Sequence, residues 1–117
     1  MSSMKRVEAL IRPERLEAVK VALSEAGVTG LNVHTVVGRG EMAPEERRAG
    51  RAGETVLVDM LPKVKLDTVV SDWNVENVIA VIREHGGTGD LGDGLIFVSD
   101  IEEAISIRTG ERGNETL

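Results

Sequence analysis

The chain has 117 residues, which suffices for one domain and is too short for two. Hydrophobic residues make up 41% and charged residues 29%, a globular balance that excludes a disordered chain. The net charge of −6 and the near absence of aromatic residues, one Trp and one Phe, argue against binding nucleic acid.

The absence of cysteine excludes disulfides and thiolate chemistry and is typical of a reducing cytoplasm. The longest unbroken apolar run, residues 78–82, is far shorter than the roughly 20 residues of a membrane-spanning helix. Residues 1–15 lack the apolar core of a secretory signal. We therefore expect a cytoplasmic protein with no direct membrane insertion.

The first part of the chain predicts a strand, a helix and a second strand. Apolar residues alternate over residues 5–11, as in a half-buried strand. Pro13 suits the first turn of a helix, apolar residues then recur at helical spacing to Ala26, and Gly27 follows as the C-cap. Alternation returns over residues 31–37, which predicts the second strand.

Residues 38–54 interrupt this pattern. They hold four Gly, four Arg and four Glu and show no hydrophobic periodicity, which predicts a long loop. Long loops in compact domains are uncommon and usually functional. Gly38-Arg39-Gly40 at the root of this loop fits either a plain hinge or a phosphate-contacting turn.

The second half repeats the order of the first. A strand is expected at 55–61, ended by Pro62, and extended chain follows at 64–70; a helix closing at Gly86-Gly87 comes next, then strands at 95–98 and 105–108 and a mobile tail at 110–117. This order commonly folds as a split βαβ sandwich, with both helices on one face of an antiparallel sheet. The uncovered sheet face predicts oligomerisation of this single domain, residues 1–117.

The segment Thr88–Gly94, which we call the glycine turn, joins the second helix to the following strand. Its glycines permit close approach of a ligand, and its N–H groups suit an anion nest; a tight connector with two Asp residues fits equally well. It is not a Walker motif, because no Gly-Lys-Ser/Thr ends it.

Other polar residues give no sign of catalysis. Lys63 and Lys65 share one strand face and, like Arg108, have the simple interpretation of surface charges. His34 and His85 are too isolated for a metal pair, and no nucleophile stands beside an acid/base pair. The sequence predicts neither an enzyme nor a metal site.

Four segments, taken in order and spacing, resemble the PII signal-transduction (nitrogen regulatory) protein family. They are MKRVEALIRP (4–13, followed by Arg15-Leu16), LPKVKL (61–66), TGDLGDGLIFV (88–98) and IRTGE (107–111). The resemblance implies an α+β, ferredoxin-like βαββαβ sandwich that forms a homotrimer with its sheets facing inward. It further implies inter-subunit clefts that bind ATP or ADP competitively, and 2-oxoglutarate beside Mg-ATP. A long T-loop, here about residues 38–54, docks onto a membrane transporter or a metabolic enzyme in that family.

The resemblance also assigns site residues one by one. The glycine turn would cradle phosphates through backbone N–H groups at Thr88, Gly89, Gly92, Asp93 and Gly94. The adenine and ribose positions fall on Gly30, Asn32, Asp67 and Val69. Phosphate-contacting basic positions fall on Lys63 and Arg108, and the loop root contributes Val37, Gly38 and Arg39.

Three departures from the family pattern concern the phosphates and 2-oxoglutarate. Glu41-Met42 replaces Arg-Gln, Leu95 replaces a phosphate-binding Lys, and Ser106 replaces one of two Arg residues. Because a charge-assisted contact contributes roughly 1.5–3 kcal/mol, losing three would cost a triphosphate several decades of affinity. We expect ADP or AMP to be favoured over Mg-ATP, and a weak or absent response to 2-oxoglutarate.

Features of the T-loop qualify these expectations. Arginines that fold back over the phosphates would restore ATP binding; the candidates are Arg39, Arg47, Arg48 and Arg51. The T-loop has no Tyr, and no Ser or Thr precedes Thr55, so the usual sites of covalent switching are missing.

Two alternatives to the nucleotide sensor remain at this point. One is a trimeric scaffold or interaction protein that has lost nucleotide sensing. The other is a carbon-sensing PII-like variant that responds to bicarbonate together with AMP or ADP. The sequence identifies no regulated partner.

Overall fold

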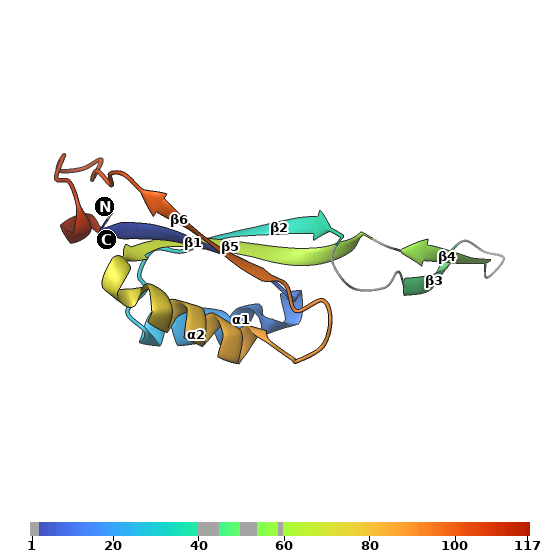
Figure 1. Ribbon diagram of the computed structural model, residues 1–117. Helices are drawn as coiled ribbons and strands as arrows, with labels where there is room; N and C mark the ends of the chain where they lie inside the picture. The colour runs from blue at the N-terminus through green and yellow to red at the C-terminus, as the bar shows by residue number, and fades with distance from the viewer. Residues whose placement is uncertain (1–2, 40–44, 50–53, 59) are drawn as a thin grey trace.

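The chain folds into a four-stranded antiparallel sheet with two helices on one face (Figure 1). The structure, a computed structural model, describes residues 3–39, 45–49, 54–58 and 60–117. Its elements are β1 (Met4–Ile11), α1 (Leu16–Glu25), β2 (Asn32–Gly38), β3 (Glu45–Ala49), β4 (Glu54–Val58), β5 (Leu61–Ser71), α2 (Val75–Gly86) and β6 (Leu95–Ile101). Strand order β2-β5-β1-β6 with both helices on one side confirms the predicted ferredoxin-like α+β fold.

The core lies between the sheet and the helices. Alternate residues of β1, namely Val7, Ala9 and Ile11, are buried beneath the helices. Residues at helical spacing on α1 and α2 pack onto them, among them Leu23 and Val78. Each fully buried aliphatic side chain contributes about 1.5–3 kcal/mol, so the two amphipathic helices and the half-buried sheet stabilise one another.

The opposite face of the sheet carries no helix. Leu95 and Phe97 on β6 are 61% and 51% exposed there. Lys65 on β5 forms an ion pair with Glu8 on β1, 3.4 Å between Nζ and Oε1. The predicted homotrimer would cover this face; the structure describes a single chain, so the trimer stays a prediction.

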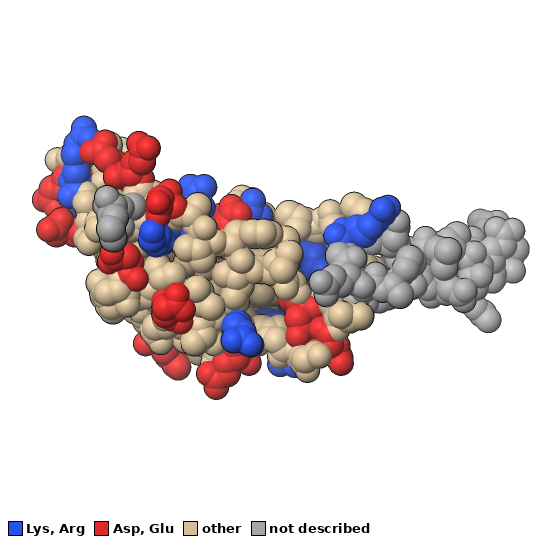
Figure 2. Space-filling view, viewed as in Figure 1, with Lys and Arg blue, Asp and Glu red and all other residues tan. Residues whose placement is uncertain are grey.

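Acidic side chains lie along the outer surface of the helical layer (Figure 2). Glu17 on α1 and Glu84 on α2 are among them, and both are highly exposed. In the part of the chain that the structure describes, no helix is both long enough and apolar enough to cross a membrane.

The structure departs from the predicted loop at residues 38–54. Backbone pairing of β3 with β4 makes a second, two-stranded sheet that projects beyond the ends of β2 and β5 (Figure 1). The expected structureless segment therefore contains strand, and residues 40–44 and 50–53 of it lie outside the described residues. Pairing with a neighbouring strand stabilises β3, and its own sequence pattern does not reveal that partner.

The predicted break at Pro62 is also wrong. Strand β5 begins at Leu61 and runs through Pro62, which lies opposite Val37 of β2. The pairing of β5 with β1 ends at Val64, so no strand lies on that side of Pro62. A proline, which has no N–H, is tolerated at such a position.

The C-terminal segment forms turns where a last strand was expected. Residues 105–108 make no strand; Ile105 forms an isolated bridge with Arg112, and a 3-10 helix follows at Asn114–Thr116. Ser106 closes the intervening turn, because its N–H donates to the carbonyl of Glu111 and its own carbonyl accepts from Gly110 N–H. The predicted tail at residues 110–117 thus contains a hydrogen-bonded turn.

Candidate functional site

The glycine turn joins α2 to β6 through a backbone that requires glycine. Gly89, Gly92 and Gly94 have φ values of +90°, +93° and +107°, a region that other residues rarely adopt. A Cβ atom on Gly94 would lie 1.7 Å from the carbonyl oxygen of Leu10, so only glycine lets β6 enter the sheet beside β1 here.

A carboxylate inside the glycine turn organises its first half. Asp93 accepts hydrogen bonds from the backbone N–H groups of Thr88 and Gly89, each at 2.8 Å, and from the Thr88 hydroxyl at 2.5 Å. These bonds, foremost those from Thr88, together with the Arg12 guanidinium, hold the pKa of Asp93 well below its usual range.

The same bonds decide which N–H groups of the turn are available to a ligand. Those of Thr88 and Gly89 already donate to Asp93, whereas those of Gly92 and Gly94 donate no hydrogen bond within the described residues. An anion at this turn would therefore be met by its second half.

Two basic side chains hold the glycine turn from outside. Arg12, which follows β1, donates from Nε to Asp93 Oδ1 at 3.0 Å and from Nη2 to the carbonyl of Leu91 at 2.8 Å. Lys63 of β5 donates from Nζ to the carbonyl of Gly92 at 2.5 Å. Sequence reasoning missed Arg12, because nothing in its local pattern indicates a partner 81 residues away.

A cavity of about 500 Å³ lies between the glycine turn and the ends of β2 and β5. Eight of the fourteen predicted site residues line it: Val37, Gly38, Arg39, Lys63, Gly89, Gly92, Asp93 and Gly94. The prediction did not include Leu10, Val36, Asp90 or Leu91, which also line it; Leu95, noted above only as a departure, stands there too.

The described lining of this cavity carries charges of both signs. Among the described residues that line it, Arg39 and Lys63 are basic, while Asp90 and Asp93 are acidic. Leu95, more than half exposed, adds an apolar wall. Within the described residues, the cavity therefore presents to a small anion the side chains of Arg39 and Lys63 and the N–H groups of Gly92 and Gly94, beside the carboxylates of Asp90 and Asp93.

Five predicted residues lie towards the other end of the sheet. Asn32 stands opposite Asp67 in the pairing of β2 with β5. Gly30 accepts a hydrogen bond from the hydroxyl of Thr68, which places it beside Asp67 and Val69. Asp67 is four residues along β5 from Lys63, a separation of ~13 Å at about 3.3 Å per residue.

Arg108, the fifth of these residues, is exposed in the C-terminal turn. That turn follows β6, whose last residue pairs with the first residue of β1, Met4. Thr88, the remaining predicted residue, belongs to the glycine turn without lining the cavity. One copy of the chain thus holds the predicted residues in two separated groups.

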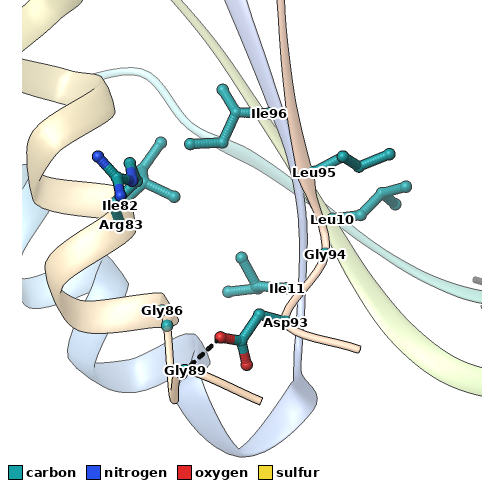
Figure 3. Close-up of a pocket in the computed structure, with 11 residues that line it drawn as sticks. Leu10, Ile11, Ile82, Arg83, Gly86, Gly89, Asp93, Gly94, Leu95 and Ile96 are labelled. Carbon is teal, nitrogen blue, oxygen red and sulfur yellow. Dashed lines mark hydrogen bonds between the residues drawn. The ribbon is translucent and has the colours of Figure 1, made fainter. Parts of the chain in front are cut away.

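A smaller cavity of about 370 Å³ lies on the helix side of the glycine turn (Figure 3). Ile11, Ile82 and Ile96 form its apolar floor between the sheet and α2, and the exposed Arg83 stands at its edge. It shares Gly89, Asp93 and Gly94 with the larger cavity, so the glycine turn separates the two.

The histidines do not contribute to either cavity. His34 lies opposite Lys65 in the sheet, and His85 lies 3.8 Å from Glu84 on α2. The described residues contain no group of three acidic or histidine side chains that could hold a metal ion.

Comparison with known proteins gives concordant matches in family, sequence and fold. The model of the family described as nitrogen regulatory protein P-II matches residues 4–111. Nitrogen regulatory protein P-II 2 of Methanothermobacter thermautotrophicus is 44% identical, with all of both chains covered. Nitrogen regulatory protein P-II of Bradyrhizobium diazoefficiens is 47% identical, covering 97% of this chain and all of that protein.

A solved structure agrees with the fold. Bacillus subtilis GlnK superposes with a TM-score of 0.78 at 34% identity, and the match covers 97% of this chain and 98% of that one. The similarity therefore extends over the sheet, both helices and the segment that contains the candidate site.

Proposed function

The chain belongs to the nitrogen regulatory protein P-II family, and from this premise we propose that it senses an adenine nucleotide in clefts between the subunits of a homotrimer. P-II proteins are signalling regulators and not enzymes. The proposal favours ADP or AMP over Mg-ATP. The nucleotide-bound state would regulate a partner protein, a membrane transporter or a metabolic enzyme, through the T-loop.

The observation that carries this proposal is the cavity at the glycine turn. It brings the N–H groups of Gly92 and Gly94, which donate no hydrogen bond to any described residue, together with Lys63 and Arg39 near the root of the T-loop. Backbone N–H groups and a neighbouring cation are the usual means by which proteins hold phosphate oxygens. An occupant of this cavity would lie directly against the end of β2, from which the T-loop begins.

The two separated groups of predicted residues support the placement between subunits. The cavity lies at one end of β5, whereas Asn32, Asp67 and Arg108 lie towards the other end. A single nucleotide reaches both groups when the far end of one chain meets the cavity of another. The exposed Leu95 and Phe97 on the helix-free face give such copies an apolar surface to bury.

The acidic residues Asp90 and Asp93 in the described lining favour a ligand with few phosphates. Each added phosphate brings negative charge towards these carboxylates, of which Asp93 is paired with Arg12 and Asp90 offsets one lining cation. Leu95 offers no hydrogen bond where the family pattern places a lysine. ATP, with the largest charge, loses most from these two features, and AMP loses least.

Calorimetric titration with Mg-ATP, ADP and AMP tests the proposal, each with and without 2-oxoglutarate and bicarbonate. We expect saturable binding of ADP or AMP, weaker binding of Mg-ATP and little change with 2-oxoglutarate. A response to bicarbonate would instead indicate the carbon-sensing variant. The absence of binding by all three nucleotides would contradict the sensor and favour the scaffold, which the apolar Leu95 also suits.

A pair of lysine variants tests the assigned cavity. Lys63→Ala removes a cation from the cavity, and we expect ADP to bind roughly tenfold to a hundredfold more weakly, since a charge-assisted bond contributes about 1.5–3 kcal/mol. Lys65→Ala removes the same charge from the same face of β5 but lies outside the cavity. Equal ADP affinities for these two variants would place the nucleotide elsewhere. Analytical sedimentation of both variants checks that their oligomeric state matches that of the wild type.

A further inference from the structure

Arg12 holds the glycine turn without entering the cavity that the turn lines. It lies outside the lining of the 500 Å³ cavity and of the helix-side cavity. Its two hydrogen bonds nevertheless reach two parts of the turn, the Asp93 carboxylate and the Leu91 carbonyl. Arg12 would therefore act on a ligand in the cavity indirectly, through the Asp93 carboxylate and the backbone of the turn.

The backbone around Arg12 is itself fixed. Its φ and ψ of −66° and 138° are extended, as the following Pro13 requires, and its carbonyl accepts from the N–H of Arg15 at 3.0 Å. The Arg12 side chain is only 18% exposed. A guanidinium on this base presents two donors in one plane, a geometry that a lysine cannot reproduce.

The first half of the glycine turn is held by the bonds from Thr88 and Gly89 to Asp93, whereas the carbonyls of Leu91 and Gly92 in its second half accept from Arg12 and Lys63. Its three positive-φ glycines are conformationally permissive, and Leu91 at its tip is exposed. Lys63, the other basic contact, lines the cavity and would turn to a bound phosphate. Arg12 lies outside the described lining of both cavities, so a ligand in either cavity would not compete for its two hydrogen bonds.

We propose that Arg12 is the positioning residue that keeps the glycine turn in its phosphate-binding conformation before a nucleotide arrives. This inference rests on the proposed function, in that the turn is taken to meet phosphate. Order supplied in advance lowers the entropy lost on binding, so affinity for phosphate-bearing ligands depends on Arg12. Adenosine, which has no phosphate, does not benefit from this order.

The test compares Arg12→Gln, Arg12→Lys and Arg83→Gln. Arg83 stands at the edge of the helix-side cavity, and its side chain makes no hydrogen bond or ion pair within the described residues, so Arg83→Gln is a control with the same change of charge. Calorimetry with ADP, AMP and adenosine gives the affinities. Amide hydrogen exchange over residues 88–94 reports the order of the turn without any ligand.

We expect Arg12→Gln to weaken ADP binding about tenfold, adenosine binding to stay unchanged and exchange at residues 88–94 to accelerate. Arg12→Lys, which keeps the charge and one bond at a time, falls between wild type and Arg12→Gln. Wild-type affinity for ADP in Arg12→Gln, or equal losses of ADP and adenosine, would overturn the inference.

The failure of the proposed function gives a different result. If the wild-type protein binds no nucleotide, the proposed sensor function is wrong. Amide exchange is then the experiment that still tests whether Arg12 orders the glycine turn. Exchange in Arg12→Gln as slow as in Arg83→Gln would then show that Arg12 does not order the turn.

Discussion

Restoring a cation at residue 95 tests how the cavity selects among phosphates. Leu95 lines the cavity and is 61% exposed, so a lysine has room there. Leu95→Lys adds one charge-assisted hydrogen bond, about 1.5–3 kcal/mol, offset by about 1.5 kcal/mol for ordering the lysine side chain. The net gain is therefore at most about 1.5 kcal/mol, and a gain of about 1 kcal/mol corresponds to roughly fivefold tighter ADP binding.

Val21→Lys is the matched control. Val21 on α1 is 56% exposed, carries a comparable apolar side chain and lies outside the cavity. Both variants raise the net charge by one, so any long-range effect of charge is shared. Titration calorimetry with Mg-ATP, ADP and AMP should show a gain for Leu95→Lys alone, smallest for AMP.

Salt provides a second check on the same reasoning. The electrostatic screening length falls from about 10 Å at 0.1 M salt to about 3 Å at 1 M salt, so the gain in ADP affinity from a partly exposed lysine should shrink. Leu95→Lys and Val21→Lys with the same ADP affinity at low salt would refute the view that Leu95 stands at the phosphates.

Two further predictions concern the glycine turn itself. Gly94→Ala should lower the free energy of unfolding by more than about 3 kcal/mol, because its Cβ would meet the Leu10 carbonyl. Gly89→Ala, which has open space around its Cβ, should cost only about 1–2 kcal/mol of backbone strain. Equal stabilities of the two variants in urea unfolding would contradict this prediction. The folded-state pKa of Asp93 lies below its ordinary value of 3.8, so the stabilisation it gives is complete above that pH and is lost as pH falls below it. Urea unfolding at about pH 7, 4 and 3 should therefore show a steeper acid loss in wild type than in Asp93→Asn, and parallel losses would argue against this assignment.

The elements built on the core were predictable from the sequence. Strand β1 and the two helices each bury one face, so their apolar residues recur at the spacing of a strand or a helix. That periodicity placed β1 within one residue of its observed start and also predicted the single helical layer. Burial of one face produces a periodic pattern within the element's own residues, so it can be recognised from the sequence alone.

The misplaced elements lack such a signal. Strand β3 is polar and is stabilised by its pairing with β4. Pro62 fits within β5 because the pairing of β5 with β1 stops at Val64, so no β1 residue lies opposite Pro62. Both depend on pairing with another strand, β4 in the first case and β1 in the second, and neither segment's own pattern displays that pairing. The strand expected at residues 105–108 is the opposite case, a strand-like pattern without a strand. Two isoleucines alternate there, but no neighbouring strand pairs with them.

The candidate site divides in the same way. Glycines and lysines in recognisable segments indicated the glycine turn and Lys63, and the structure brings these together. Arg12 and Leu10 were missed because each acts across the sheet corner on a turn some 80 residues later. Their roles follow from the antiparallel pairing of β1 with β6, which places the end of β1 beside the start of β6.

The position of the cavity relative to β2 and β5 gives the proposed sensor a direct route to its T-loop. These two strands lead into β3 and β4, and their paired ends carry cavity residues Gly38 and Lys63. An occupant touching these residues contacts the base of the T-loop on both sides. An occupant can shift the equilibrium between two arrangements of that base only by the difference in its binding free energy for the two. A phosphate that drew the Lys63 ammonium away from the Gly92 carbonyl would supply such a difference.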